Sequence, residues 1–198
     1  GLILRSSCTE EESAAIAEDI AEMQVMARNV LADAEGPAEK LTDGDGPHVT
    51  AWREWTETAD VVTEEGSFDA LGVLDAVEDL RSPRVPLGNG AFMFIEPTRA
   101  LVAVDVNTGT DTSPAATLRA NIAAAKDLPR QLRLRGLGGQ ITLDLAPMPK
   151  KDRRAFESAL RAAFKADTED TILVGWTNLG HFELQRKRSR LAVAGLLS

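Results

Sequence analysis

Two short apolar segments, each ending in an aspartate, place the strongest constraint on the fold of this chain. Residues 100–104 precede Asp105, residues 140–143 precede Asp144, and a long helical pattern joins the two segments. Strand, helix and strand in this order form a βαβ unit with parallel strands and a right-handed crossover. Parallel strands end at the same sheet edge, where ligands bind in open α/β sheets. We therefore predict that the two carboxylates converge at that edge.

The patterns around this unit predict a larger sheet. The expected strands are 84–87, 91–96, 100–106, 140–145 and 171–176, the first two forming a hairpin around a Gly-Asn-Gly turn. Helices are expected at 114–135, with a kink or interruption at Pro129, and at 150–166. The predicted fold class is α/β (α+β), with a mixed sheet flanked by helices.

The first 83 residues predict helices and loops in place of a sheet. Apolar residues at helical spacing indicate helices from Thr9 to about residue 36 and at 67–79, with a short piece around 52–55 and an apolar strand at 1–4. A Gly-, Pro- and Asp-rich loop at 36–48 is the best candidate for a boundary. The expected divisions are 1–48, 49–83 and 84–198.

Composition narrows the setting of the protein. A chain of 198 residues can form one well-packed domain with a smaller appendage, and no segment is apolar enough over its length to cross a bilayer. Its single cysteine, Cys8, can form no internal disulfide and no zinc site by itself. We expect a cytoplasmic protein with no membrane partner.

The charge is unevenly distributed along the chain. Residues 1–100 carry 7 Lys and Arg against 21 Asp and Glu, whereas residues 101–198 carry 15 against 10. A basic half of this kind favours contact with a polyanion. Mutual neutralisation of the two halves explains the same distribution, and charge alone does not separate these interpretations.

Asp105 and Asp144 have the chemistry of a divalent-metal site. A buried carboxylate is costly without a compensating charge, and two close carboxylates repel each other. Oxygen ligands select Mg²⁺, and Mn²⁺ also fits. Asn107 would face the same way as Asp105 in a strand and could orient its carboxylate. On spacing alone, an aspartate at a strand end more often caps the following helix or turn.

Several motifs in the second half resemble the ribonuclease E/G family. They are Glu-Pro-Thr-Arg-Ala-Leu-Val-Ala-Val-Asp-Val-Asn-Thr-Gly at 96–109, Asn-Ile-Ala-Ala-Ala at 121–125, Arg-Gln-Leu-Arg-Leu-Arg-Gly-Leu-Gly-Gly at 130–139, Ile-Thr-Leu-Asp-Leu-Ala-Pro-Met at 141–148 and Leu-Gly-His-Phe-Glu-Leu-Gln-Arg-Lys-Arg at 179–188. Their order matches the family over most of residues 84–190. Residues 1–6 resemble the strand that opens the 5′-end sensor of the same family.

The resemblance implies an endoribonuclease that cleaves single-stranded RNA and leaves a 5′-phosphate and a 3′-hydroxyl. Asp105 and Asp144 would be the Mg²⁺ ligands, Asn107 would support them, and Arg5 and Ser6 would hold a 5′-monophosphate. Residues 84–198 would then be a DNase I-like catalytic subdomain, 49–83 a shortened RNase H-like or linker region, and 1–48 a remnant of the 5′-end sensor. The chain lacks the family's OB-fold domain and zinc-binding Cys-x-x-Cys, so any homo-oligomer is not expected to be zinc-linked.

Basic residues near the motifs are candidates for contacts with RNA phosphates, and they include Arg130, Arg133, Lys150 and Lys151. A solvated helical surface explains the arginine cluster equally well. Few aromatic residues lie near these clusters, which argues against base stacking there. Trp176 and Phe182 are expected in the core, and His48 and His181 are expected to be structural or solvent-facing.

Departures from the family pattern leave a second interpretation open. Pro147 stands where the family usually has an aspartate, and Ala115 and Ala116 stand where acidic residues usually follow the first motif. These changes motivate an alternative, a catalytically weak or inactive RNA-binding module.

Overall fold

The computed structural model describes residues 3–4, 12–54 and 59–196. The chain divides into two compact units, Gly1–Val61 and Val62–Ser198, a boundary that falls between the two divisions expected at residues 48 and 83. Arg5, Ser6 and Thr9 lie outside the described residues. Among the described residues, no helix combines the length and the apolar character that a membrane crossing requires.

The first unit is helical. It contains α1 (Ser13–Ala32) and α2 (Pro47–Glu54), and α1 ends before the end predicted near residue 36. No residue of α1 is fully buried, and its apolar residues Ile16, Ile20 and Val30 are only partly covered. Ile3 and Leu4, which the sequence predicted to be part of a strand, are not in one.

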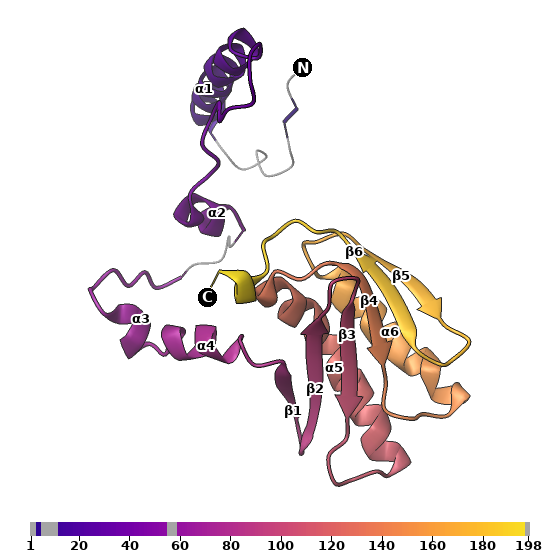
Figure 1. The fold of residues 1–198 in the computed structure, drawn as a ribbon. Helices are drawn as coiled ribbons and strands as arrows, with labels where there is room; N and C mark the ends of the chain where they lie inside the picture. Colours follow the sequence, from indigo (N-terminus) through magenta and orange to yellow (C-terminus); the bar gives the residue numbers. More distant parts are fainter. Residues whose placement is uncertain (1–2, 5–11, 55–58, 197–198) are drawn as a thin grey trace. The chain divides into compact units, whose positions relative to one another are not determined.

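The second unit begins with two short helices and continues into a six-stranded sheet (Figure 1). The helices are α3 (Ser67–Ala70) and α4 (Val73–Asp79), separated by Gly72 at φ 68°, where a single helix was predicted. The strands are β1 (Arg84–Gly88), β2 (Ala91–Pro97), β3 (Val102–Asn107), β4 (Gly139–Asp144), β5 (Thr171–Trp176) and β6 (Phe182–Arg186), in the spatial order β1-β2-β3-β4-β6-β5.

The sheet is mixed, as the sequence predicted. β3 and β4 are parallel and adjacent, and every other neighbouring pair is antiparallel. The prediction missed β6, which lies between β4 and β5. Its inward residues are Phe182, Leu184 and Arg186, so an arginine interrupts the apolar alternation that identifies a strand.

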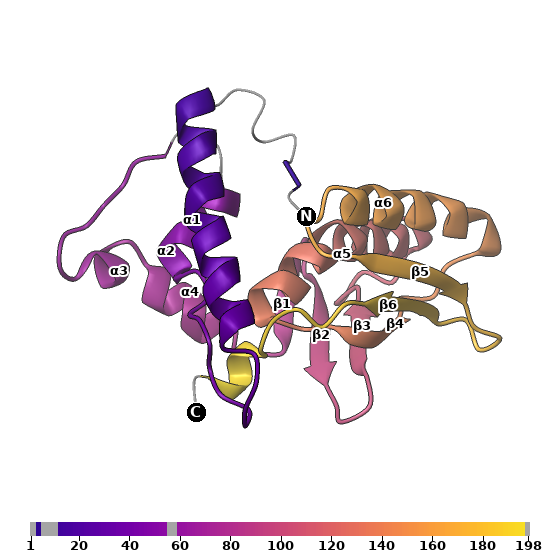
Figure 2. The ribbon, with the colours of Figure 1, turned by 90° about the horizontal axis from the view of Figure 1, so that it is seen from above.

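Two helices cover one face of the sheet (Figure 2). They are α5 (Pro114–Arg135) and α6 (Arg153–Lys165), the latter preceded by the 3₁₀ turn η2 (Lys150–Asp152). Ser113 caps α5 by accepting from the Ala116 N–H, and Gly136 ends it in the left-handed conformation. The helix continues through Pro129, so the predicted interruption is wrong. Leu128 and Leu132, which flank Pro129, are both buried in the core.

The hydrophobic core lies between the helices and the sheet. Each fully buried aliphatic or aromatic side chain contributes about 1.5–3 kcal/mol to folding. The central members are Met93, Ile95, Val104, Ile141, Leu143, Leu184, Leu128, Leu132, Phe156 and Leu160.

Side chains alternate along each strand, so the residues between these core positions point to the other side of the sheet. We call this side the open face. Its residues on the three central strands are Phe92, Phe94 and Glu96 of β2, Ala103, Asp105 and Asn107 of β3, and Gln140, Thr142 and Asp144 of β4. Ile172 and Val174 of β5 are 67% and 62% exposed on the same face. The open face is thus the accessible side of the sheet within the second unit.

A buried cluster of charged residues, Asp167 with Arg133 of α5 and Arg186 of β6, links β6 to the helix layer. The carboxylate of Asp167 is 1% exposed; it accepts a hydrogen bond from Arg186 and another from Arg133 at 2.8 Å. Arg186 is 2% exposed and also donates to Thr171 Oγ1 at 3.0 Å. Because it is buried, Arg186 is not available for contacts with RNA phosphates.

Candidate functional site

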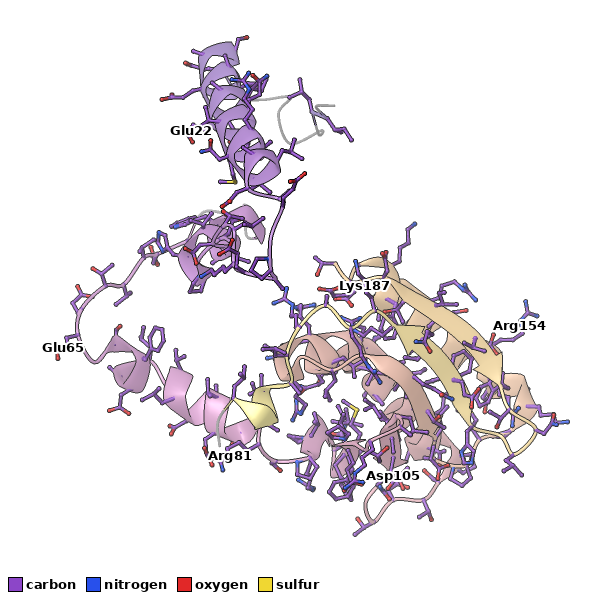
Figure 3. All side chains as sticks on the ribbon, turned by 45° about the horizontal axis from the view of Figure 1, so that its top comes forward. Glu22, Glu65, Arg81, Asp105, Arg154 and Lys187 are labelled. Carbon is purple, nitrogen blue, oxygen red and sulfur yellow. The ribbon has the colours of Figure 1, made fainter. Side chains whose placement is uncertain are left out.

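Asp105 and Asp144 lie directly opposite each other on β3 and β4. Neighbouring strands are about 4.8 Å apart, and both side chains project from the open face. The two carboxylates therefore share one edge of the sheet, as the βαβ pattern predicted. Figure 3 shows Asp105 at one end of the second unit and Lys187 toward the other.

The carboxylates are exposed, which corrects one part of the sequence argument. Both aspartates are accessible, and the Asp144 side chain is 67% exposed. Because the two carboxylates are exposed to solvent, desolvation does not require a cation to compensate their charge. What favours a cation is the proximity of two like charges in register, together with a set of oxygen donors.

Asn107 lies two residues beyond Asp105 on the same face of β3. Its Nδ2 donates a hydrogen bond to Asp105 Oδ2 at 2.8 Å. The amide therefore holds one carboxylate oxygen of Asp105 and leaves Oδ1 for another partner. The hydrogen bond agrees with the predicted orientation of Asn107, and the role of Asn107 at a metal site stays a prediction.

His181, which the sequence predicted to be structural or solvent-facing, lies beside Asp144. Its Nδ1 lies 3.3 Å from Asp144 Oδ1, an electrostatic contact without hydrogen-bond geometry. His181 directly precedes β6, and β6 pairs with β4 up to the residue before Asp144. No sequence pattern could identify this contact, because it depends on β6 lying beside β4.

The loop after β3 is held by its own polar groups. Asp111 Oδ1 accepts from the Ser113 backbone N–H at 2.9 Å. This bond, followed by one from the Ser113 side chain, lowers the pKa of Asp111 from its ordinary value of 3.8; desolvation opposes the shift, and the charge of Arg119 adds to it. At Gly109, φ is 72° and a Cβ would lie 2.4 Å from Gly90 O, so the loop passes directly over the hairpin turn.

The donor set suits magnesium better than zinc. Asp105, Asp144 and Asn107 offer oxygen atoms, and Mg²⁺ is commonly bound by one or two carboxylates with several retained waters. Among residues 3–4, 12–54 and 59–196, no group of three or more His, Cys, Asp or Glu is arranged to hold a metal ion.

Sequence comparison decides the family. The sequence model of the ribonuclease E/G family matches residues 48–189. The chain belongs to the ribonuclease E/G family. Its similar proteins include Ribonuclease G of Escherichia coli (strain K12), 34% identical over 139 residues that cover 66% of this chain and 28% of the relative. The match includes β1 to β6 and does not include residues 1–47, whose likeness to a 5′-end sensor stays a prediction.

Two further relatives extend the comparison. The Ribonuclease E/G-like protein, chloroplastic, of Arabidopsis thaliana is 33% identical over 138 residues, covering 66% of this chain and 14% of the relative. Ribonuclease E of Nostoc sp. is 37% identical over 118 residues, covering 57% of this chain and 17% of the relative. The chain thus spans less than a third of the length of these ribonuclease E/G relatives.

The three positions predicted to depart from the ribonuclease E/G pattern lie on the segments that follow β3 and β4. Pro147 is exposed three residues after Asp144, and Ala115 and Ala116 form the first turn of α5. Ala116 is 8% exposed and packs inward, so an acidic side chain at that position would be costly. The candidate site therefore contains two carboxylates, Asp105 and Asp144, among the residues that the structure describes.

The predicted basic residues divide into two groups. Arg130 and Arg133 lie near the end of α5, which returns the chain to the opposite end of the sheet. Arg130 pairs with Asp127 at 3.5 Å, and Arg133 pairs with Asp167 at 2.8 Å. The structure does not bring these two arginines to the aspartates. Lys150 and Lys151 are exposed in η2, on the segment that leaves β4 beyond Asp144. Of the four, the lysines are the better-placed candidates for phosphate contacts.

Phe182 is buried, as predicted, and packs against Phe156 and Trp176 at centroid distances of 5.8 Å and 5.3 Å. Trp176 is half-buried, with the guanidinium of Arg153 over its ring at 4.1 Å. Its Nε1 donates to Glu157 Oε1 at 2.5 Å. These contacts make the aromatic group part of the packing between α6 and the sheet.

Proposed function

We propose that this chain belongs to a metal-dependent endoribonuclease that cleaves single-stranded RNA, leaving a 5′-phosphate and a 3′-hydroxyl, in RNA processing or decay. The observation that carries the proposal is the register of Asp105 with Asp144 on the accessible face of the sheet. Membership of the ribonuclease E/G family supports RNA as the substrate. The hydrogen bond from Asn107 to Asp105 supports a positioned ligand.

Each residue has a distinct task in this proposal. Asp105 and Asp144 would hold Mg²⁺, for which Mn²⁺ is a plausible replacement, and Asn107 would orient Asp105. The ion would polarise a phosphate oxygen and lower the pKa of an attacking water. Lys150 and Lys151 would attract the RNA backbone in a salt-dependent manner.

Further features of the proposal come from the family resemblance. Arg5 and Ser6 would bind the 5′-monophosphate of the substrate, because a guanidinium and a hydroxyl both donate to phosphate oxygens. The protein would act in the cytoplasm. It would assemble, if at all, without zinc.

A cleavage assay tests the proposal. The chain is incubated with a single-stranded RNA carrying either a 5′-phosphate or a 5′-hydroxyl, with Mg²⁺ or with EDTA. We expect Mg²⁺-dependent cleavage that Asp105→Asn and Asp144→Asn each abolish while circular dichroism stays unchanged. Asn107→Ala should reduce the rate about 10–100-fold. If Asp105→Asn and Asp144→Asn both cleave at the wild-type rate at equal Mg²⁺, the site assignment is wrong.

Glu96→Gln is the matched control for these variants. Glu96 is an exposed carboxylate on the open face, opposite Ala103 and one row from Asp105. Its substitution removes a negative charge from the same surface without touching the paired aspartates. Cleavage should therefore continue at close to the wild-type rate.

The second candidate is a non-catalytic RNA-binding module of the same family. The restriction of the site to two carboxylates, with Pro147 and Ala116 nearby, favours it. Binding of 5′-monophosphorylated RNA without turnover in either Mg²⁺ or Mn²⁺ would identify this module. Turnover in either ion would exclude it.

A further inference from the structure

Two phenylalanines occupy the open face of β2, where the neighbouring strands carry polar residues. Phe92 and Phe94 alternate with Met93 and Ile95, which are 0% and 1% exposed in the core. The two rings are half-buried and contact each other edge to face, with centroids 5.5 Å apart. Neither ring belongs to the hydrophobic core or its fringe. The core therefore does not explain why these positions are aromatic.

The pairing of β2 with β3 places these rings beside the paired aspartates. Phe94 is the partner of Asp105 and Phe92 is the partner of Asn107. Directly opposite residues on one face of an antiparallel pair have Cβ atoms about 4.5–5.5 Å apart. Phe94, Asp105 and Asp144 therefore form one continuous row across β2, β3 and β4.

A cation completes this row at its outer end. Arg84 of β1 is the strand partner of Phe94, and its guanidinium lies 4.3 Å from the centroid of the Phe92 ring. A guanidinium on an aromatic ring offers a flat cationic surface that can stack on a base or bind a phosphate. The open face thus carries a cation, an aromatic pair and an acidic pair on adjacent strands.

We infer that Arg84, Phe92 and Phe94 form a stacking surface for one nucleobase of a single-stranded polynucleotide, next to the phosphate that a metal ion held by Asp105 and Asp144 would bind. This inference rests on the proposed function, which supplies the phosphate. Aromatic rings stack on every base, because every base has a π-face. An unpaired base can stack on one of these planar groups, the Phe94 ring or the guanidinium of Arg84 over Phe92, whereas a base within a duplex has both faces covered by its neighbours. The surface therefore selects single strands.

The chemistry of the open face favours RNA over a protein segment as its ligand. A protein segment covering Phe92 and Phe94 would require apolar contact over a wide area, but this surface continues directly into Asp105, Asn107 and Asp144. Arg84 adds a positive charge on the other flank. A ligand with a flat ring and a neighbouring anionic group complements Arg84 directly, and it complements the acidic flank through the cation proposed at Asp105 and Asp144.

The test compares the full chain with a Phe92→Leu, Phe94→Leu double variant, which keeps apolar side chains and removes the aromatic faces. The probe is a fluorescent single-stranded RNA, intact or with one abasic site moved stepwise across the cleavage position. For the wild type, we expect an abasic site at one position to weaken binding about tenfold. The double variant should bind the intact RNA about tenfold more weakly, and the same abasic site should then have no further effect.

Ile172→Ala with Val174→Ala is the matched control, because these residues are also apolar and exposed on the open face but lie on β5, at the edge of the sheet beyond β6. It should bind like the wild type. Equal affinity of the Leu variant and the wild type for intact RNA would overturn the inference, as would an abasic effect that persists in the variant. A large loss of thermal stability in the Leu variant with unchanged RNA binding would assign the rings to protein packing and overturn it as well.

Binding and cleavage are measured separately, so the inference and the proposed function can fail independently. Binding is measured in Ca²⁺, which also takes oxygen ligands, on RNA shown to stay intact, and KM and kcat are measured in Mg²⁺. A raised KM with little change in kcat in the Leu variant supports stacking. Cleavage that is normal in both KM and kcat leaves the proposed function intact and removes the stacking surface. Binding that depends on the rings, without any cleavage, would support the stacking surface and contradict the proposed nuclease activity.

Discussion

Asn121 of α5 forms a two-bond pair with the backbone of Ala146. Its Nδ2 donates to the Ala146 carbonyl oxygen at 2.8 Å, and its Oδ1 accepts from the Ala146 N–H at 3.0 Å. Asn121 is fully buried. The amide imitates a strand partner and ties the helix layer to the segment directly after Asp144. The position of Asp144 thus depends on a residue of the crossover helix.

Asn121→Ala should destabilise the fold and weaken the proposed site together. The variant leaves the N–H and the carbonyl of Ala146 without their partner, at a cost of about 1–3 kcal/mol. Urea unfolding measures this loss, and the cleavage rate should fall because the backbone beyond Asp144 is released. Lys126→Ala, an exposed change on the same helix, should stay within about 0.5 kcal/mol of the wild type. Equal stability of the two variants would contradict the role of Asn121.

Asp167→Asn should be among the most destabilising changes of a charged residue in the second unit. It leaves the guanidinium of Arg186, which is 2% exposed, without its carboxylate, and breaking such a buried pair costs about 3–5 kcal/mol. Arg133→Ala should cost less, because the Arg133 side chain is 35% exposed. Chemical denaturation of both variants tests this order, with the exposed Asp170→Asn as the control. A larger effect at Arg133 than at Asp167 would refute it.

Added Mg²⁺ should stabilise the wild-type fold. An ion that binds only the folded chain contributes about 2.7 kcal/mol at a concentration 100 times its Kd. Thermal unfolding in MgCl₂ and in EDTA, at matched ionic strength, measures the gain. Asp105→Asn and Asp144→Asn should each remove most of it, whereas Glu96→Gln should retain it. An undiminished gain in both Asn variants would place the ion elsewhere.

Asp111 should titrate below its ordinary pKa of 3.8, because the Ser113 backbone N–H, the Ser113 side chain and Arg119 all favour its charged form. Since the folded-state pKa lies below the unfolded one, its contribution to stability is complete above the unfolded pKa and is lost as the pH falls through the folded value. Carbon NMR of the carboxyl group gives the midpoint. Ser113→Ala should raise the midpoint part of the way, since the backbone donor remains. A wild-type midpoint at or above 3.8 would show that the loop does not hold the carboxylate.

The sequence was sufficient for the central unit of the fold and for its acidic pair. Apolar runs ending at Asp105 and Asp144 predicted parallel neighbours, because local strand patterns and a long crossover helix leave few other connections. Asn107 was predictable for a similar reason, since strand alternation places residues two apart on one side. These relations depend on periodicity within single elements.

The relations that the sequence did not predict depend on contacts between distant elements. β6 was missed because the charge of Arg186 concealed a strand, and that charge is matched by Asp167 from a separate segment. The contact of His181 with Asp144 follows from the same strand. The position of Phe94 beside Asp105 follows from the register of β2 with β3. The sequence analysis looked for aromatic residues near basic clusters, and that search gives no information on the register of two strands.

The parallel register of β3 and β4 keeps Asp105 and Asp144 opposite each other whatever the length of the connecting turns. It makes their position highly sensitive to the loss or gain of a single residue within either strand. An insertion at the end of α5 would lengthen a turn and leave the two carboxylates opposite each other, because the ladder between the strands fixes their separation. A deletion of one residue within β4 would rotate Asp144 into the helix-packed core and bring Leu143 to the surface. The turns at the ends of the crossover can therefore vary in length over evolution as long as Asn121 keeps its place, whereas the site-bearing strands can change only in steps of two residues.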